Sequence, residues 1–477
     1  MDCCDTINFM ENHTQVNKLR FLLALWIGKA AAAAAKRIAP GRGSNISGEI
    51  ALKIAPDFLY GFTGIDLEKT IFVTGTNGKS TTAHMIVHAF RTAGHSVCAN
   101  GEGANLIAGT ATALLKRSAL FGSMKDEWLI LEVDERSLAS VCKAIPARHV
   151  CVTNIQKDQV QRNGDPDFIY QKIKSAIAPG MVLYLNNDEP RSKSLERFAN
   201  RAVRFGVAPL RPADAGSQQQ GGAGAEFWRV TMPCPVCHDA LRFTQTNVAG
   251  VGTYVCPACG FANDPAPDCL IETADFERGF FRIGTETFPL VYRTPYFLYN
   301  YALCAAVGLG NGISAETLRR ALDGFVNIGG RYETFETAGK LVQYIRIKQE
   351  NPETLQNALD VIAADRRTKA FFVGLDVVND IIPAYSNTFY AFDCDFGALA
   401  ASGVERSVCF TRTVGYDMAG RLRYAGIPDE HIELLASDDE GEILTRIHAC
   451  EAPVVYLITL LKKYEKLRAY AEAEAGA

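Results

Sequence analysis

The sequence lacks an excess of charge of either sign. Its 49 Lys and Arg residues stand against 53 Asp and Glu residues, so the net charge is only -4 over 477 residues. A general nucleic-acid binder needs a strongly basic face to neutralise phosphates, and this balance argues against that class. Apolar residues make up 48% and charged residues 21%, as in ordinary globular proteins. A chain of this length is expected to fold as two or three domains.

An uncharged apolar run long enough to cross a membrane is also missing. The stretch FLLALWIGKAAAAAAKRI, residues 21–38, is interrupted by Lys29 and Lys36, so it does not reach the ~20 residues that a spanning helix requires. A cleaved signal is not expected, because about twenty polar and acidic residues precede the run. Two interpretations stay open: an amphipathic helix packed on the next domain, or a helix lying on a membrane surface.

Four of the 14 cysteines form a metal-ligand pattern. Cys234 and Cys237 make one Cys-x-x-Cys pair, and Cys256 and Cys259 make a second pair after 18 intervening residues. Disulfides are disfavoured because no signal peptide is expected and the other ten cysteines show no pairing logic. Four thiolates complete a tetrahedral Zn²⁺ shell and leave no open position. We therefore predict a structural zinc ribbon, with His238 as a solvated turn residue.

Strands alternate with helices from residue 69 onward. Buried-strand candidates are TIFVTG, EWLILEVDE, ARHVCVTNI, MVLYLNND and AVRFGV, and this alternation predicts an α/β fold with a doubly wound parallel sheet. The stretch CLIETADFERGFFRIGTETFPLVYR, residues 269–293, is predicted to be a hairpin. A second α/β unit has strand candidates LVQYIRI, KAFFVGL, RSVCFTRT and PVVYLITL.

The same pattern predicts the domain boundaries. We expect an N-terminal helical segment at 1–56, a central ATPase domain at 57–328 and a C-terminal α/β domain at 329–477. A Gly-, Ala- and Gln-rich tract at 207–226 interrupts the central domain and is predicted to be flexible. It leads into the ribbon at 227–264, which is therefore an insertion.

The stretch TGTNGKSTT, residues 74–82, lies where a strand gives way to a helix. Backbone N–H groups and a helix N-terminus bind phosphate at such a junction. The loop is more compact than a standard Walker A loop, because Val73 stands where the longer motif has its first glycine. Lys79 is expected to bind the β- and γ-phosphates and Ser80 to bind Mg²⁺. Glu132, at the end of a neighbouring strand, is either a second Mg²⁺ ligand or a solvated strand end.

The loop GTNGKSTT resembles the ATP loop of the Mur ligase superfamily, which includes folylpolyglutamate synthetases. The pieces LEVDE, TNIQKDQ, YNYALCAA and GGRYETFE occur in the order of that superfamily. The inserted ribbon and the stretches ENPETLQNAL and RTVGYDMAGRLRYAGI resemble the MurT family, the synthetase subunit of lipid II isoglutaminyl synthase. The resemblance covers nearly the whole chain. It implies a Mur-ligase-like central P-loop domain with a parallel-rich sheet and a smaller Rossmann-like C-terminal domain.

The resemblance also implies a reaction. It indicates an ATP-dependent carbon–nitrogen ligase of peptidoglycan synthesis that amidates the D-glutamate α-carboxylate of the lipid II stem peptide to D-isoglutamine. ATP would phosphorylate the carboxylate, and ammonia would displace the phosphate. A GatD-type glutaminase subunit is the implied ammonia source, and ATP, Mg²⁺ and Zn²⁺ are the implied cofactors. The implied location is cytoplasmic, with the lipid II substrate at the inner membrane surface.

Residue roles follow from the same resemblance. Asn154 and Asp158 would line the reacting phosphoryl group, beside Lys79 and Glu132. Phosphate and Mg²⁺ binding is assigned to the loop residues Gly75, Thr76, Asn77, Gly78, Lys79, Ser80 and Thr81. Asn300 would face adenine, or be a helix-surface amide. Arg331 would contact nucleotide phosphate from the hinge, or be a solvated linker charge.

Two segments depart from the family pattern. Residues 350–354 read Glu-Asn-Pro-Glu-Thr where the family usually has Lys-Asn-Pro-Ala-Gly, and Asn387 stands at an acid thought to help the partner's glutaminase site. These changes leave a second hypothesis open, a divergent Mur-type ligase with another acceptor or nitrogen source. A third hypothesis is a nucleotide-dependent binding protein whose zinc ribbon contacts nucleic acid or protein. The near-neutral charge and the few basic residues of the ribbon count against it.

Overall fold

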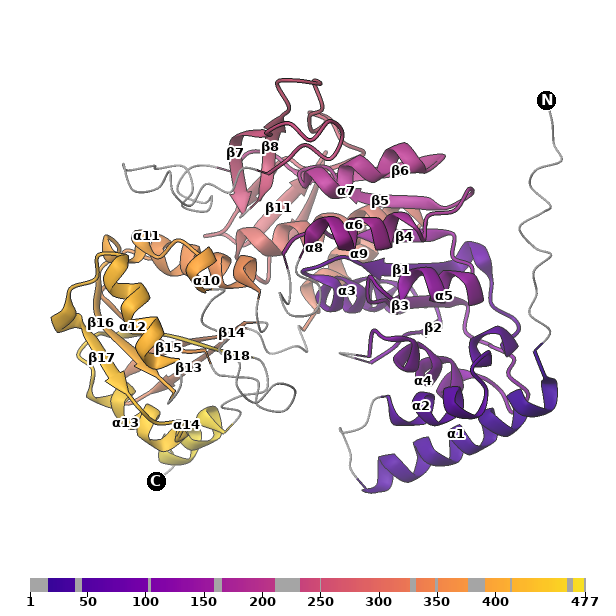
Figure 1. The fold of residues 1–477 in the computed structure, drawn as a ribbon, viewed down its shortest axis with the longest axis horizontal. Helices are drawn as coiled ribbons and strands as arrows, with labels where there is room; N and C mark the ends of the chain where they lie inside the picture. Colours follow the sequence, from indigo (N-terminus) through magenta and orange to yellow (C-terminus); the bar gives the residue numbers. More distant parts are fainter. Residues whose placement is uncertain are drawn as a thin grey trace.

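The chain folds into an N-terminal helical layer, a central α/β domain that carries the ribbon, and a C-terminal α/β domain (Figure 1). This computed structural model describes residues 16–38, 45–101, 104–157, 165–210, 232–248, 250–326, 332–347, 351–375, 391–411, 414–460 and 466–475. Most of the tract predicted to be flexible lies outside the described residues. So do Asp158, Arg331, Glu350 and Asn387.

The N-terminal layer consists of α1 (Lys18–Ile38), α2 (Ile46–Ile54) and the short helix η1 (Phe58–Gly61), packed on α4 (Ile107–Arg117). Phe21 of α1 lies with its ring centroid 5.3 Å from those of Phe58 and Phe62. Among the residues that the structure describes, no helix combines the length and the apolar character needed to cross a bilayer. One side of α1 packs on the protein, as the packed-helix interpretation predicts, because Phe21, Ala24 and Leu25 are buried there. Several apolar residues on its other side are exposed.

The central sheet has seven parallel strands in the order β2-β3-β1-β4-β5-β6-β9. Their bounds are β1 (Thr70–Thr74), β2 (Val97–Cys98), β3 (Trp128–Glu132), β4 (His149–Val152), β5 (Val182–Asn186), β6 (Arg201–Val207) and β9 (Cys269–Ile271). Strands β1, β3, β4 and β5 are buried along their whole length, as the inner strands of a parallel sheet are, which explains their apolar runs. The predicted α/β fold with a parallel central sheet is confirmed.

Alternate residues of β1 enter different cores. Ile71 and Val73 pack with α3 (Lys79–Thr92), α8 (Pro295–Gly310) and α9 (Ala315–Asp323), whereas Phe72 packs toward the N-terminal helices. Helices α5 (Leu138–Ala144) and α6 (Pro166–Lys174) complete that second layer. The chain leaves β1 toward β2 and β3 on one side and returns through β4 on the other. The loop after β1 thus lies at the switch point of the sheet, where α/β proteins bind ligands.

The segment predicted to be one hairpin has a different structure. Strand β9 is an edge strand of the central sheet beside β6, and only the following residues form an antiparallel sheet. That sheet consists of β10 (Thr273–Asp275), β11 (Phe280–Ile283) and β12 (Glu286–Pro289). The three-residue strand β9 is too short for its partner to be read from sequence. The ribbon contributes its own hairpin, β7 (Arg242–Val248) and β8 (Val251–Val255).

The C-terminal sheet has the order β13-β14-β18-β15-β16-β17. Its strands are β13 (Tyr332–Thr337), β14 (Lys340–Ile347), β15 (Lys369–Gly374), β16 (Val404–Phe410), β17 (Ile432–Leu435) and β18 (Val454–Leu460). Strand β13 is antiparallel to β14 and the other pairs are parallel, so this smaller α/β domain has a mixed sheet. The helices are α10 (Pro352–Ala364), α11 (Gly397–Ala400), α12 (Gly415–Tyr424), α13 (Glu440–Ala449) and α14 (Leu467–Ala475).

Candidate active site

The loop between β1 and α3 needs glycine at two positions. Gly75 has φ 117° and Gly78 has φ 81°, a region that other residues rarely adopt. A Cβ atom at Gly75 would lie 2.4 Å from Thr153 Oγ1, and a Cβ atom at Gly78 would lie 2.5 Å from Asn300 Oδ1. Backbone conformation and close packing therefore both require the two glycines of the motif.

Asn154 holds the loop in place. The backbone N–H of Thr76 donates to Asn154 O at 2.8 Å, and the N–H of Asn77 donates to Asn154 Oδ1 at 2.9 Å. In return, Asn154 Nδ2 donates to Asn77 O at 3.0 Å. All three residues are buried. The observed contacts of Asn154 are thus with the loop backbone, from the end of the neighbouring strand β4.

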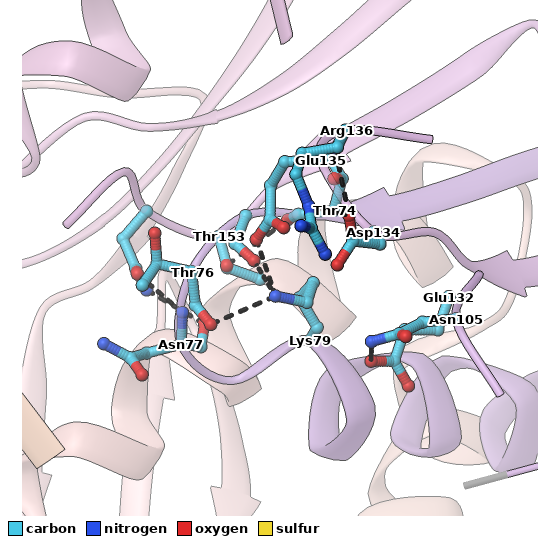
Figure 2. A network of polar contacts seen from close by, with 12 residues as sticks. Thr74, Thr76, Asn77, Lys79, Asn105, Glu132, Asp134, Glu135, Arg136 and Thr153 are labelled. Atoms are coloured by element: carbon cyan, nitrogen blue, oxygen red, sulfur yellow. Dashed lines mark hydrogen bonds and ion pairs between the residues drawn. The ribbon is translucent and has the colours of Figure 1, made fainter. Parts of the chain in front are cut away.

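The ammonium group of Lys79 lies between the loop and a carboxylate. Its Nζ donates to the carbonyl oxygens of Gly75 and Thr76, and it forms a 2.6 Å ion pair with Glu135 Oε1 (Figure 2). The side chains of Lys79 and Glu135 are 7% and 3% exposed, so this pair is shielded from water. No motif in the sequence predicts a role for Glu135. The sequence feature that could have indicated it is its place at the end of LEVDE, three residues after the end of β3.

Glu132 lies apart from that ion pair, beside Asn105 (Figure 2). Its Oε1 accepts a hydrogen bond from Asn105 Nδ2 at 3.0 Å, and the residue pairs with Val73 in the β1–β3 register. Glu132 is buried, and none of the described Lys, Arg or His residues forms an ion pair with it. A buried carboxylate without a protein cation suits a Mg²⁺ ligand. Ser80 lies half-buried in the first turn of α3, and Thr81 is buried beside it.

Asn300 projects from α8 onto the phosphate loop. Its Oδ1 accepts from Thr82 Oγ1 at 3.1 Å, while its Nδ2 is buried with no hydrogen-bond partner among the described residues. Asn300 lines a small cavity with Tyr296, and the ribbon hairpin contributes Val248 and Val251 to the wall. An unpartnered buried donor is costly in isolation, so the site suits a ligand that offers acceptors, as a nucleotide does.

Residues 351–354 of the altered ENPET segment lie against the phosphate loop. Asn351 Nδ2 donates to Asn77 Oδ1 at 2.9 Å, and the side chain of Thr354 contacts the same oxygen at 3.3 Å. Glu353 Oε1 accepts from the backbone N–H of Lys157 at 3.1 Å. These contacts bring the start of α10 in the C-terminal domain to the nucleotide loop. Asp158, Arg331 and Asn387 lie outside the described residues, so the structure does not place them.

The four ribbon cysteines converge on one point. Their Sγ atoms all lie within 4.8 Å of one another, with Cys234 3.7 Å from Cys259 and Cys237 3.5 Å from Cys256. A hydrogen bond from the backbone N–H of Cys259 lowers the pKa of the Cys256 thiol to about 7, whereas the pKa values of the other three thiols are raised. His238 is not part of the cluster and has φ 67°. Four soft ligands in this arrangement fit a zinc ion with a closed shell.

Hydrogen bonds hold the ribbon to the central domain beside the candidate nucleotide site. Tyr254 Oη donates to Asn187 O at 3.2 Å, and the N–H of Gly252 donates to Asp188 O at 2.9 Å. Asn247 Nδ2 donates to Tyr299 Oη at 3.1 Å, and that hydroxyl donates to Asp188 Oδ2 at 3.1 Å. Burial raises the pKa of Asp188 to about 6, although hydrogen bonds to the carboxylate oppose the shift. Tyr299 precedes Asn300 on α8, so the ribbon reaches the site through one buried network.

Comparisons with known proteins agree with this geometry. The sequence of residues 73–226 matches the family of Mur ligase middle domains. The sequence of residues 349–462 matches the family of MurT ligase C-terminal domains. The MurT subunit of lipid II isoglutaminyl synthase (glutamine-hydrolyzing) from Staphylococcus aureus (strain COL) is 25% identical over 417 residues, covering 86% of this chain and 89% of that protein. The subunit of the same name from Streptococcus pneumoniae (strain ATCC BAA-255 / R6) is 27% identical over 427 residues, with 87% and 89% covered.

The fold has a counterpart among solved structures. The pseudomurein peptide ligase type C from Methanothermus fervidus superposes with a TM-score of 0.63 at 17% identity, covering 88% of this chain and 81% of that one. The parallel sheet and the phosphate loop at its switch point thus define an ATP-dependent ligase of the Mur ligase superfamily. Within that superfamily, the chain is similar to MurT subunits over 86–87% of its length, and its residues 349–462 match the MurT ligase C-terminal domain.

Proposed function

We propose that this chain is the synthetase subunit of a lipid II isoglutaminyl synthase. It would convert the D-glutamate α-carboxylate of the lipid II stem peptide to the amide of D-isoglutamine at the expense of ATP. The observation that carries the proposal is the match to two MurT subunits over 86–87% of the chain, which includes both the phosphate loop and the C-terminal domain. We propose residues 57–328 as the ATPase domain and 329–477 as the C-terminal α/β domain of the MurT type.

The chain's own residues support phosphoryl transfer to a carboxylate. When bound, MgATP supplies the phosphoryl group that turns a carboxylate oxygen into a leaving group. Lys79 holds a positive charge at the loop, where it offsets phosphate charge once it exchanges Glu135 for the nucleotide. Glu132 and Ser80 would hold Mg²⁺. Asn300 Nδ2, which has no hydrogen-bond partner within the part of the chain that the structure describes, would donate to the nucleotide. Asp158 and Arg331 keep the phosphoryl-lining and hinge roles that the family resemblance implies.

Ammonia delivery is the second part of the proposal. We propose a GatD-type glutaminase partner and a cytoplasmic location, with lipid II reached at the inner membrane face. The test is mass spectrometry of lipid II after incubation with the purified chain, ATP and Mg²⁺, with either ammonium or glutamine plus a GatD-type glutaminase. Amidation in both settings is the expected result and would show that Asn387 is tolerated. Amidation with ammonium alone would indicate a synthetase without glutamine coupling.

A divergent Mur-type ligase with another acceptor is the second candidate. The observation that favours it is the position of the altered segment, since Glu353 and Thr354 contact the nucleotide-binding side of the central domain directly. Substitutions at that position can change how the reacting groups are aligned. The same mass spectrometry decides between the two candidates. ATP binding without amidation of lipid II under either nitrogen source would favour the divergent ligase.

A further inference from the structure

Helix α1 is apolar on both of its sides. One side is buried, through Phe21, Ala24 and Leu25. The opposite side exposes Leu19, Leu23, Trp26 and Ile27 by 81, 51, 47 and 42%. These positions recur at helical spacing and therefore form one stripe. Exposed alanines continue the stripe toward the C-terminal end of the helix.

A loop enlarges this stripe. Leu120 and Phe121, in the turn after α4, are 64% and 70% exposed. Trp26 Nε1 donates to Leu120 O at 2.8 Å, which places the loop directly against the helix. We name this surface the α1 apolar face and define it as Leu19, Leu23, Trp26, Ile27, Leu120 and Phe121. Figure 1 shows α1 at the outer edge of the molecule, with α2 and α4 between it and the central sheet.

The orientation of α1 is fixed by its buried side. Lys29 Nζ donates to the carbonyl oxygens of Leu115 and Ser118, both at 2.6 Å. A Cβ atom at Gly28 would lie 2.2 Å from the Leu115 side chain, so the helix packs closely there. The exposed apolar residues are therefore held outward and cannot turn into the core. A helix at a water-facing surface normally carries polar residues on that side, and contiguous apolar patches mark interaction surfaces.

The charges of α1 indicate what covers this face. The helix sequence contains five basic residues and no acidic residue. Lys18 and Arg20 are exposed at its start and Arg37 at its end, so basic groups flank the apolar stripe at both ends. Apolar side chains including Trp, flanked by Lys and Arg, match the boundary between acyl chains and anionic headgroups. A second copy of this chain would instead bring the same basic ends together.

We propose that the α1 apolar face docks on the surface of an anionic phospholipid bilayer, with α1 lying in the plane of the interface. The proposal goes beyond the proposed function and rests on it in one respect, because docking would present the catalytic domain to a lipid-linked substrate. Leu23, Trp26 and Phe121 enter the acyl boundary, and the basic ends of α1 contact the headgroups. The helix is anchored on the membrane and does not span it.

The test is flotation of the full chain with vesicles of phosphatidylglycerol and phosphatidylcholine, compared with vesicles of phosphatidylcholine alone. The chain is expected to float with the anionic vesicles, and less so at high salt. The double variant Leu23→Gln/Phe121→Gln should reduce the bound fraction about tenfold, because two apolar side chains no longer enter the interface. Tyr424→Gln removes an 88% exposed ring from the C-terminal domain and is the matched control.

Three outcomes would overturn the docking proposal. They are no binding to anionic vesicles, equal binding by the double variant and the parent, and a dimer in light scattering that the double variant abolishes. The last would assign the face to a second copy. Amidation with ammonium of lipid II in detergent is measured in parallel. If vesicle binding is normal but no amidation occurs in detergent, the proposed function fails and the docking surface stands.

Discussion

Asn351 Nδ2 donates a hydrogen bond to Asn77 Oδ1 at 2.9 Å, across 274 residues of sequence. Asn351 is the N-cap of α10 in the C-terminal domain, and Asn77 lies in the phosphate loop. Both side chains are buried, so the hydrogen bond is shielded from water. Losing it would leave a buried polar group without this partner, which is costly. The C-terminal domain therefore takes part in shaping the loop that is expected to hold ATP.

Replacing Asn351 with Asp separates this bond from the helix cap. Asn351 Oδ1 accepts from the N–H of Thr354 at 2.7 Å, and an aspartate keeps that cap but cannot donate to Asn77. We expect Asn351→Asp to raise the KM for ATP roughly tenfold, because Asn77 Oδ1 loses the shorter of two hydrogen bonds and faces a carboxylate oxygen instead, at a cost of about 1–3 kcal/mol. Asn351→Ala also removes the cap and should lower stability by about 1 kcal/mol more. Steady-state kinetics and calorimetry measure both; an unchanged KM in Asn351→Asp would contradict the expectation.

The ion pair between Lys79 and Glu135 predicts a cycle of three variants. Lys79→Met should abolish amidation and lower the free energy of unfolding by about 3–5 kcal/mol, since it removes the ammonium group that faces the buried Glu135 carboxylate. Glu135→Gln keeps an acceptor oxygen for Lys79 Nζ and should lose less stability. The double variant removes both charges and should recover stability without activity. Urea unfolding and nucleotide-binding calorimetry are the measurements. Nucleotide affinity equal to that of the parent in Lys79→Met would refute the role of Lys79.

The sequence predicted features that depend on local pattern. A β-branched run followed by GTNGKS predicts a strand, then a loop, then a helix. This prediction is possible because strand propensity and glycine conformation act within a few residues. The pairing of Lys79 with Glu135 was missed because LEVDE offers three acids, and only the geometry beyond the end of β3 selects among them. The contact of Asn351 with Asn77 depends on how two domains pack, which spacing along the chain does not encode.

The ribbon shows the same division between local and tertiary information. Its metal-ligand pattern was readable from spacing, and the four Sγ atoms do converge. How the ribbon attaches to the central domain could not be predicted from this spacing. The attachment depends on hydrogen bonds from Gly252 and Tyr254 to residues 187 and 188 of the central domain. Strand β9 is a similar case, because three apolar residues give no sign of which sheet they join.

Zinc removal provides the next prediction. Cys256→Ser should strongly lower the zinc content measured by metal analysis, since a hydroxyl is a poor fourth ligand to Zn²⁺. The melting temperature should fall, and ATP affinity should fall by a smaller factor, because Val248 and Val251 of the ribbon hairpin line the same cavity as Asn300. His238→Asn is the control: asparagine tolerates positive φ, and this variant should keep its zinc. Equal zinc in Cys256→Ser and the parent would refute the ligand assignment.

Asp188 predicts a specific pH dependence of stability. Burial raises its pKa in the folded chain from 3.8 to about 6. Between these values the folded state binds more protons than the unfolded state, so this group's contribution to stability falls as pH rises from about 4 to about 6. Asp188→Asn is neutral throughout and lacks that fall. The difference in unfolding free energy between variant and parent should therefore grow across the window, by up to about 3 kcal/mol.

Tyr299→Phe extends the same test. The Tyr299 hydroxyl donates to the Asp188 carboxylate and thereby opposes the upward shift of its pKa. Removing that donor should raise the pKa of Asp188 further, so the loss of stability should continue to higher pH than in the parent. Chemical denaturation at a series of pH values measures both variants against the parent. If the curves of Asp188→Asn and the parent run parallel between pH ~4 and ~6, Asp188 is not the group that titrates in this window.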